Sequence, residues 1–95
     1  MISDGQVVSR LGGLLEAETN GEIVGLHIEQ VACYGFNSTA TRVWQLLEQP
    51  RTKAELRRIL LQEFDVPADV CDRDLDELLR RLEQDRLVEM KAASA

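Results

Sequence analysis

Two kinds of hydrophobic periodicity divide the chain. Between residues 14 and 36, apolar and polar residues alternate, and this period of two is typical of β-strands. The alternation predicts strands at 14–19, around 24–28 and from Val31 to Phe36, and Asn20-Gly21 supplies the positive-φ residues of a tight hairpin between the first two. We expect a three-stranded antiparallel meander, preceded by a short extended segment from Val7 to Leu11.

After residue 37 the apolar residues recur every three or four positions, which indicates amphipathic helices. Asn37 or Ser38 offers a side-chain oxygen to the free amides of a first helix. The apolar stripe of that helix consists of Ala40, Val43, Trp44 and Leu47. Trp44 lies in the middle of the stripe, so we expect it to anchor the core.

Two more helices follow. Thr52 and Glu55 have the spacing of a capping box, which predicts the start of a second helix. Asp65-Val66-Pro67 ends it, because the residue before a proline avoids the helical region. A third helix is predicted from about Pro67 to Asp85, and Leu87-Val88 is expected to pack back on the core. The apolar face of this helix consists of Cys71, Leu75, Leu78, Leu79 and Leu82.

The predicted fold class is therefore α+β: a winged-helix-like domain with a three-stranded antiparallel sheet followed by three helices. With 95 residues and 44% hydrophobic content, the chain suits a single domain over residues 1–95. The ends, 1–6 and 91–95, are expected to be flexible. No apolar run approaches 18 residues and no signal-like segment opens the chain, so we expect a soluble, cytoplasmic protein without membrane contact.

Few residues suggest catalysis. Cys33 and Cys71 lie 38 positions apart, with His27 as the single histidine, so zinc is not expected. Two buried or half-buried thiols are the favoured interpretation, although a disulfide remains open. Assuming that Val24 and Leu26 face the core, His27 should be exposed or half-exposed. We expect no enzyme activity, no catalytic residue, no metal and no cofactor.

Nucleic-acid binding is one alternative for a small domain of this kind. A recognition helix in the major groove needs basic residues that neutralise phosphates. From Asp65 to Asp85, however, eight acidic residues oppose three arginines, a net charge of −5. The predicted strands also precede the helices, with no wing after the third helix. We therefore expect no nucleic-acid partner.

Capture of a peptide is the other alternative. The predicted third strand, Val31 to Phe36, carries no charge and can lie at the edge of the sheet. Such an edge invites an added strand, because alternate amides and carbonyls remain unpaired. Coverage of this edge by the third helix or by a second copy of the chain is the competing interpretation.

The order of motifs resembles the PqqD-like family of peptide recognition elements. The resemblance covers roughly residues 14–90 and rests on Tyr34-Gly35-Phe36-Asn37 before the first helix, Val43-Trp44 within it, and Phe64-Asp65-Val66 after the second helix. Phe36 replaces the usual Leu, and Asp85-Arg86-Leu87 departs from the usual Gly-Leu.

The resemblance implies a non-catalytic protein that binds the N-terminal leader of a ribosomally made precursor peptide by strand addition. The leader would lie between the third strand and the third helix and be presented to modifying enzymes. The implied peptide-binding residues are Val31, Ala32, Cys33, Tyr34, Gly35, Phe36, Cys71, Asp74, Leu75, Leu78, Leu79 and Leu82.

The Tyr-Gly-Phe-Asn form looks more like the stand-alone proteins of lasso-peptide clusters than like those of pyrroloquinoline quinone synthesis. The implied partners are then a leader peptidase and an ATP-dependent cyclase. A peptide chaperone for a radical enzyme, as in pyrroloquinoline quinone synthesis, is the alternative.

Overall fold

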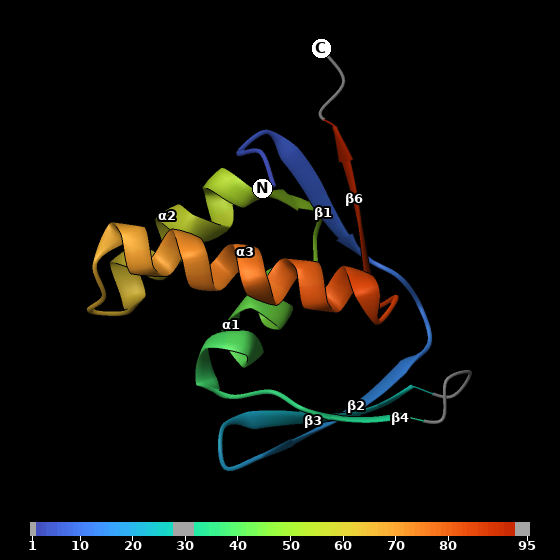
Figure 1. Ribbon diagram of the computed structural model, residues 1–95. Coiled ribbons are helices and arrows are strands. Elements are labelled where there is room, and N and C mark those ends of the chain that lie inside the picture. Colours follow the sequence, from blue (N-terminus) through green and yellow to red (C-terminus); the bar gives the residue numbers. More distant parts are fainter. Residues whose placement is uncertain (1, 28–31, 93–95) are drawn as a thin grey trace.

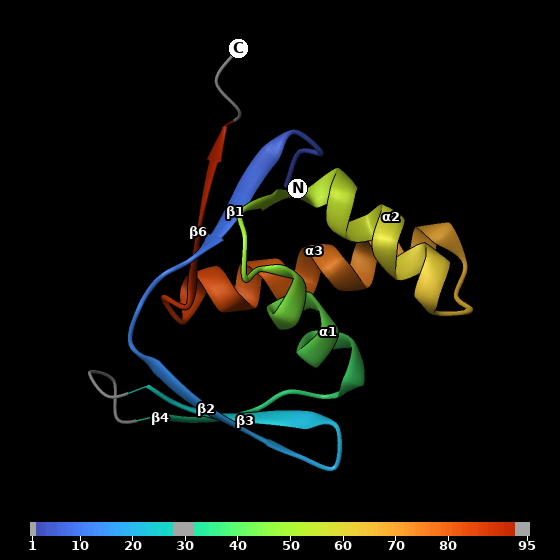
Figure 2. The same cartoon turned by 180° about the vertical axis from the view of Figure 1, so that it is seen from behind.

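The computed structural model describes residues 2–27 and 32–92, and it has the predicted α+β class (Figure 1). The elements in chain order are β1 (Gln6–Arg10), β2 (Leu14–Thr19), β3 (Glu22–His27), β4 (Ala32–Gly35), α1 (Ser38–Leu46), β5 (Arg51–Thr52), α2 (Lys53–Glu63), α3 (Ala68–Gln84) and β6 (Val88–Ala92). Seen from either side, α1 lies between α3 and the sheet formed by β2, β3 and β4 (Figures 1 and 2).

The predicted meander is confirmed as an antiparallel sheet of order β2-β3-β4. Asn20 and Gly21 adopt φ values of 53° and 79°. A two-residue type I′ hairpin turn requires positive φ at both of its central positions. β4 lies at the edge of this sheet. Of its predicted extent, Val31 is outside the described residues, and Phe36 follows the strand but still donates its amide to the carbonyl of Ile23 at 2.9 Å.

The helices begin where their caps predict. The Asn37 side chain accepts a hydrogen bond from the amide of Ala40 at 2.9 Å and starts α1. Thr52 and Glu55 form the predicted capping box at α2. α3 begins directly after Pro67, which confirms the predicted boundary.

A second sheet, of order β5-β1-β6, was not predicted. Its central strand is β1, which includes most of the segment that was expected to be a short extended stretch from Val7 to Leu11. Within this sheet Val8 of β1 pairs with Met90 of β6. The ends expected to be loose contribute to this part of the fold, because Ile2 is buried and Lys91 lies within β6. The pairing of β1 with β6 joins residues about 80 positions apart, so a pattern of neighbouring residues does not predict it.

The order of elements therefore differs from strands followed by helices. β6 comes after α3, which removes the topological argument against a nucleic-acid reader. The electrostatic argument remains, because the sequence of α3 contains six acidic residues and three arginines.

The two faces of β3 are the reverse of the prediction. His27 and Ile23 are both 4% exposed, whereas Val24 and Leu26 are 46% and 43% exposed. Gly25 explains why this face of β3 points toward the helices. A Cβ at Gly25 would lie 2.7 Å from Leu14 Cδ1, so the absence of a side chain at this position leaves room for Leu14. The alternation of strand residues was predicted correctly, but the side that faces the helices was not.

The core confirms the expected role of Trp44, which is 2% exposed and lies with its ring centroid 5.7 Å from that of Phe36. Leu87 and Val88 are buried as predicted.

Both cysteines are free, and only Cys71 is buried. Cys33 is exposed because it faces away from the helices on the edge strand. Among the described residues, no helix combines the length and apolar character needed to cross a bilayer.

Candidate functional site

A groove of about 360 Å³ separates the edge strand β4 from α3. Strand β4 and the residues after it form one wall, α3 forms the other, and the start of α1 closes the base. The lining residues are Cys33, Tyr34, Gly35, Phe36, Asn37, Ala40, Leu78, Arg81, Leu82 and Asp85. The groove therefore lies beside β4, the strand that the sequence predicts to lie at the edge of the sheet with unpaired backbone groups.

A smaller hollow of about 260 Å³ continues the groove past the end of β4. It shares Asn37, Ala40, Leu78 and Arg81 with the groove, and it adds polar side chains from both helices. These additional residues are Thr39, Asp74 and Glu77. The two spaces together follow α3 for about three turns, from Asp74 to Asp85.

The backbone of β4 divides into two sets of hydrogen-bonding groups. Phe36 donates to β3, and the registered pair two residues earlier is Tyr34 with Gly25. Because antiparallel strands alternate between hydrogen-bonded and non-hydrogen-bonded pairs, Tyr34 also directs its amide and carbonyl toward β3. Cys33 and Gly35 therefore direct theirs toward the open edge, beside the groove.

The floor of the groove is apolar and firmly packed. Phe36 is 7% exposed and is held against Trp44, while Leu82 is 4% exposed. Leu78 is half-buried and packs against the same core. An apolar side chain that enters the groove would contact these groups and lose water without needing a polar partner.

Polar groups line the rims of the groove. Tyr34 is half-buried, and burial together with the negative charge of Asp85 raises the pKa of its hydroxyl. The phenol therefore stays protonated and serves as a hydrogen-bond donor at neutral pH. The exposed Arg81 adds a positive charge to the same wall as Asp85.

Local interactions fix β4 relative to α1. The Thr41 hydroxyl accepts a hydrogen bond from the amide of Ile23 at 3.0 Å and donates to the carbonyl of Phe36 at 3.2 Å. Thr41 is 3% exposed, so one buried side chain ties together β3, the end of β4 and α1. The groove wall is therefore positioned by the core and does not depend on a free loop.

The structure brings together half of the residues that the sequence assigned to a peptide site. Cys33, Tyr34, Gly35, Phe36, Leu78 and Leu82 line the groove, and Asp74 lines the adjoining hollow. Ala32 belongs to the edge strand, and Val31 lies outside the described residues.

Three assigned residues of α3 do not line the groove. Cys71, Leu75 and Leu79 are 6%, 2% and 0% exposed and belong to the core. Burial also raises the pKa of the Cys71 thiol, which keeps this sulfur protonated and unreactive. These three residues therefore form the core face of α3, and the groove face is formed by Leu78, Arg81 and Leu82.

Sequence reasoning missed four lining residues: Asn37, Ala40, Arg81 and Asp85. A signal for two of them was present, because Leu78, Arg81, Leu82 and Asp85 follow the helical spacing i, i+3, i+4 and i+7. This stripe is rotated from the stripe of buried leucines, and its mixed polarity is typical of a helix face that borders both core and solvent.

Comparison with known proteins gives one family. The family model described as coenzyme PQQ synthesis protein D (PqqD) matches residues 22–88, which include β4, the groove and most of α3. Comparison with curated proteins finds no significant match.

Two solved structures are similar to the chain over nearly their whole length. The structure of TbiB1 in complex with the TbiA(beta) leader peptide is 27% identical, with 90% of this chain and 99% of that chain covered and a TM-score of 0.79. The lasso peptide synthetase B1 complexed with the leader peptide is 22% identical, with 86% and 96% covered and a TM-score of 0.74. The second similarity concerns the fold alone.

Proposed function

The chain belongs to the PqqD family, and on this premise we propose that it binds the N-terminal leader of a ribosomally made precursor peptide as a strand added to β4. The observation that carries the proposal is the open edge of β4 beside a groove with an apolar floor and polar rims. The similarity to TbiB1, solved with a leader peptide, supports it.

The geometry assigns separate tasks to backbone and side chains. The amides and carbonyls of Cys33 and Gly35 pair with the leader backbone, which gives affinity for many sequences. In an antiparallel pair, opposite residues project to the same face, so leader residues opposite Tyr34 enter the groove. There Phe36, Leu78 and Leu82 select apolar side chains, and the leader is held in one register.

The protein acts without chemistry of its own. Its proposed task is to present the precursor to modifying enzymes, with a leader peptidase and an ATP-dependent cyclase as partners. The Tyr34-Gly35-Phe36-Asn37 form, which resembles that of the stand-alone proteins of lasso-peptide clusters, favours these partners over a radical enzyme of the pyrroloquinoline quinone type. Incubation of the precursor with the purified chain alone should leave the precursor mass unchanged.

A proline at position 35 tests strand addition directly. The Gly35 amide points to the open edge, so Gly35→Pro removes a donor from the incoming strand without removing one from the β3–β4 ladder. Loss of one hydrogen bond, with the proline ring in the path of the leader, should weaken binding about tenfold or more. Titration calorimetry with a synthetic leader from the chain's own gene cluster measures this.

Gly35→Ala is the matched control. A Cβ at this position would meet no atom within 4 Å, so alanine should fold normally and bind within about twofold of wild type. A folded Gly35→Pro protein with wild-type affinity would show that the leader does not pair with this edge.

A further inference from the structure

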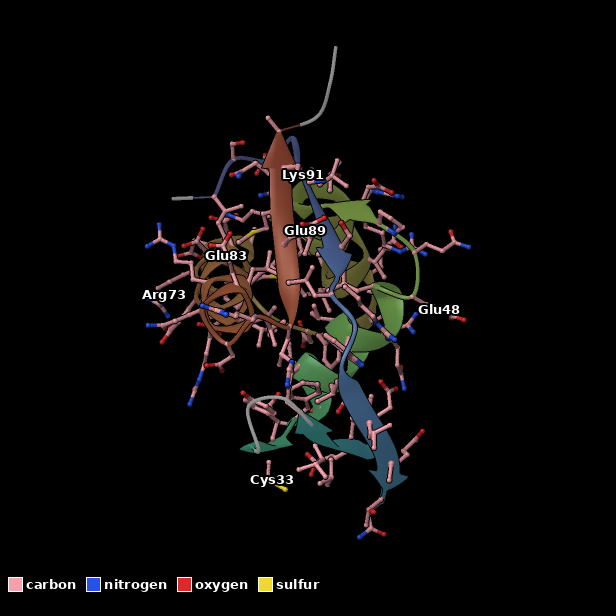
Figure 3. All side chains as sticks on the ribbon, turned by 90° about the vertical axis from the view of Figure 1, so that its right-hand side faces the viewer. Cys33, Glu48, Arg73, Glu83, Glu89 and Lys91 are labelled. Atoms are coloured by element: carbon pink, nitrogen blue, oxygen red, sulfur yellow. The ribbon has the colours of Figure 1, made fainter. Side chains whose placement is uncertain are left out.

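The face of the β2-β3-β4 sheet that points away from the helices is apolar and in register. Leu15 pairs with Leu26, which pairs with Cys33, and the next row consists of Ala17, Val24 and Gly35. The side chain of Cys33 points away from the helices in Figure 3. Leu15, Val24 and Leu26 are 59%, 46% and 43% exposed.

These three residues stand out on the described surface. They are three of the five large hydrophobic residues that are exposed in residues 2–27 and 32–92, and they gather in one place. A shallow hollow of about 270 Å³ lies among them. Single exposed apolar residues are ordinary, but a contiguous group on a sheet face indicates contact with another molecule.

This outer face continues into the proposed leader site. A strand added to β4 extends the same sheet, and its residues opposite Cys33 and Gly35 project to the outer face. A protein seated on the face would therefore touch both the chain and the bound leader. Such an arrangement suits a partner that acts on the loaded precursor.

The charges argue against a second copy of the chain as the occupant. Of the three acidic residues in β2 and β3, only Glu22 shares the outer face with Val24 and Leu26, because Glu16 and Glu18 pair with the inner-face residues Gly25 and Ile23. The described residues of β2, β3 and β4 include no lysine or arginine. The whole chain carries a formal net charge of −6. Two copies would bring together two chains of the same net charge and two Glu22 carboxylates, whereas a partner with an apolar patch and a basic group opposite Glu22 would complement this surface.

We propose that the outer face of the β2-β3-β4 sheet is the docking surface for the enzyme that processes the leader-bound precursor, and that this enzyme contributes an apolar patch with a basic group opposite Glu22. The inference rests on the proposed function for the identity of the partner. The face is distinct from the groove, because Leu15 and Val24 line only the outer hollow.

Two substitutions test the docking surface. Val24→Lys and Leu15→Lys place a charge where the partner must remove water, and each should weaken binding of the leader peptidase from the same gene cluster about tenfold or more. Val66→Lys is the matched control, because Val66 is 39% exposed but lies between α2 and α3. Interferometry with the purified peptidase, with and without leader, measures each affinity, and circular dichroism verifies folding.

We expect Leu15→Lys to keep wild-type leader affinity in calorimetry, and the wild-type chain to sediment as a monomer. Three results would overturn the inference: equal peptidase affinity of wild type and both lysine variants, loss of leader affinity in Leu15→Lys, or a wild-type dimer that Val24→Lys dissociates. If the wild-type chain binds no leader, the proposed function fails, yet the peptidase titrations without leader still decide whether this face docks the enzyme.

Discussion

The indole nitrogen Nε1 of Trp44 donates a hydrogen bond to Glu16 Oε2 at 2.7 Å. Trp44 lies on α1 and Glu16 on β2, so the bond ties one of the two edge strands of the β2-β3-β4 sheet, the one opposite β4, to the helical core. The Arg10 guanidinium lies 4.3 Å from the center of the indole ring and donates to the carbonyl of Trp44. Trp44 thus joins three elements, including the central strand of the second sheet.

Replacing Glu16 should therefore loosen the sheet that carries β4. In Glu16→Ala the nearly buried indole N–H loses its acceptor, and we expect the free energy of unfolding to fall by about 1 kcal/mol, since water can reach part of the site. Urea denaturation followed by circular dichroism measures the change. Glu18→Ala, an exposed change two residues along β2, should leave stability unaltered; an equal loss in both variants would refute the role of the hydrogen bond.

Leu78 should control leader affinity. In Leu78→Asp a carboxylate replaces the half-buried leucine of the groove, and an entering apolar side chain would have to remove its water. We expect a loss of at least about 2 kcal/mol, roughly thirtyfold in Kd. Titration calorimetry with the synthetic leader checks this after circular dichroism has shown a cooperative fold.

Two controls separate binding from folding at this position. Leu61→Asp makes the same change at a partly buried leucine of α2, so it should cost stability but not affinity. Arg58→Ala, on the exposed side of α2, should change neither. A folded Leu78→Asp protein that binds as wild type does would place the groove elsewhere.

Lys53 should be important for stability. Its side chain is 1% exposed, and its ammonium lies 3.3 Å from Asp72 and from Asp76 and 3.2 Å from the carbonyl of Ile2. Lys53→Met removes one member of a largely buried ionic group, which should lower the free energy of unfolding by roughly 2–3 kcal/mol, less than for fully buried partners. Urea denaturation would contradict this if Lys53→Met and wild type unfolded at the same concentration.

Acid should weaken the fold through Asp4 and Asp72. Hydrogen bonds from Arg57, at 2.7 Å to each, lower the pKa of both carboxyl groups. A folded-state pKa below the unfolded value contributes stability that is complete above the unfolded pKa, about 4, and disappears as the pH falls through the folded value. The free energy of unfolding should therefore be steady near neutral pH and decrease below about pH 4.

Arg57→Ala identifies the source of this decrease. Without the guanidinium the pKa of Asp4 rises toward its ordinary value, and the pKa of Asp72 rises only in part because Lys53 still contacts that carboxyl group. The variant should therefore be less stable than wild type near pH 7 and should lose less stability on acidification. Urea denaturation over a pH series gives both slopes. Equal slopes for wild type and Arg57→Ala would mean that other carboxylates cause the acid sensitivity.

The sequence by itself determined the elements whose signals are local. The hairpin at Asn20-Gly21, the cap at Asn37 and the capping box of Thr52 and Glu55 depend on residues at most three positions apart. The same is true of the core position of Trp44, which follows from helical spacing. The family resemblance also came from the sequence, because its motifs are short and ordered, and it located the open edge strand next to α3.

Only the tertiary structure decided which face of each element is buried and which distant strands pair. His27 is buried and Val24 exposed because Leu14 fills the space above Gly25, a contact that periodicity does not contain. Val8 pairs with Met90 across most of the chain. α3 buries Leu75 and turns Leu78 and Arg81 to the groove, because its rotation is set by everything packed against it and not by its own pattern.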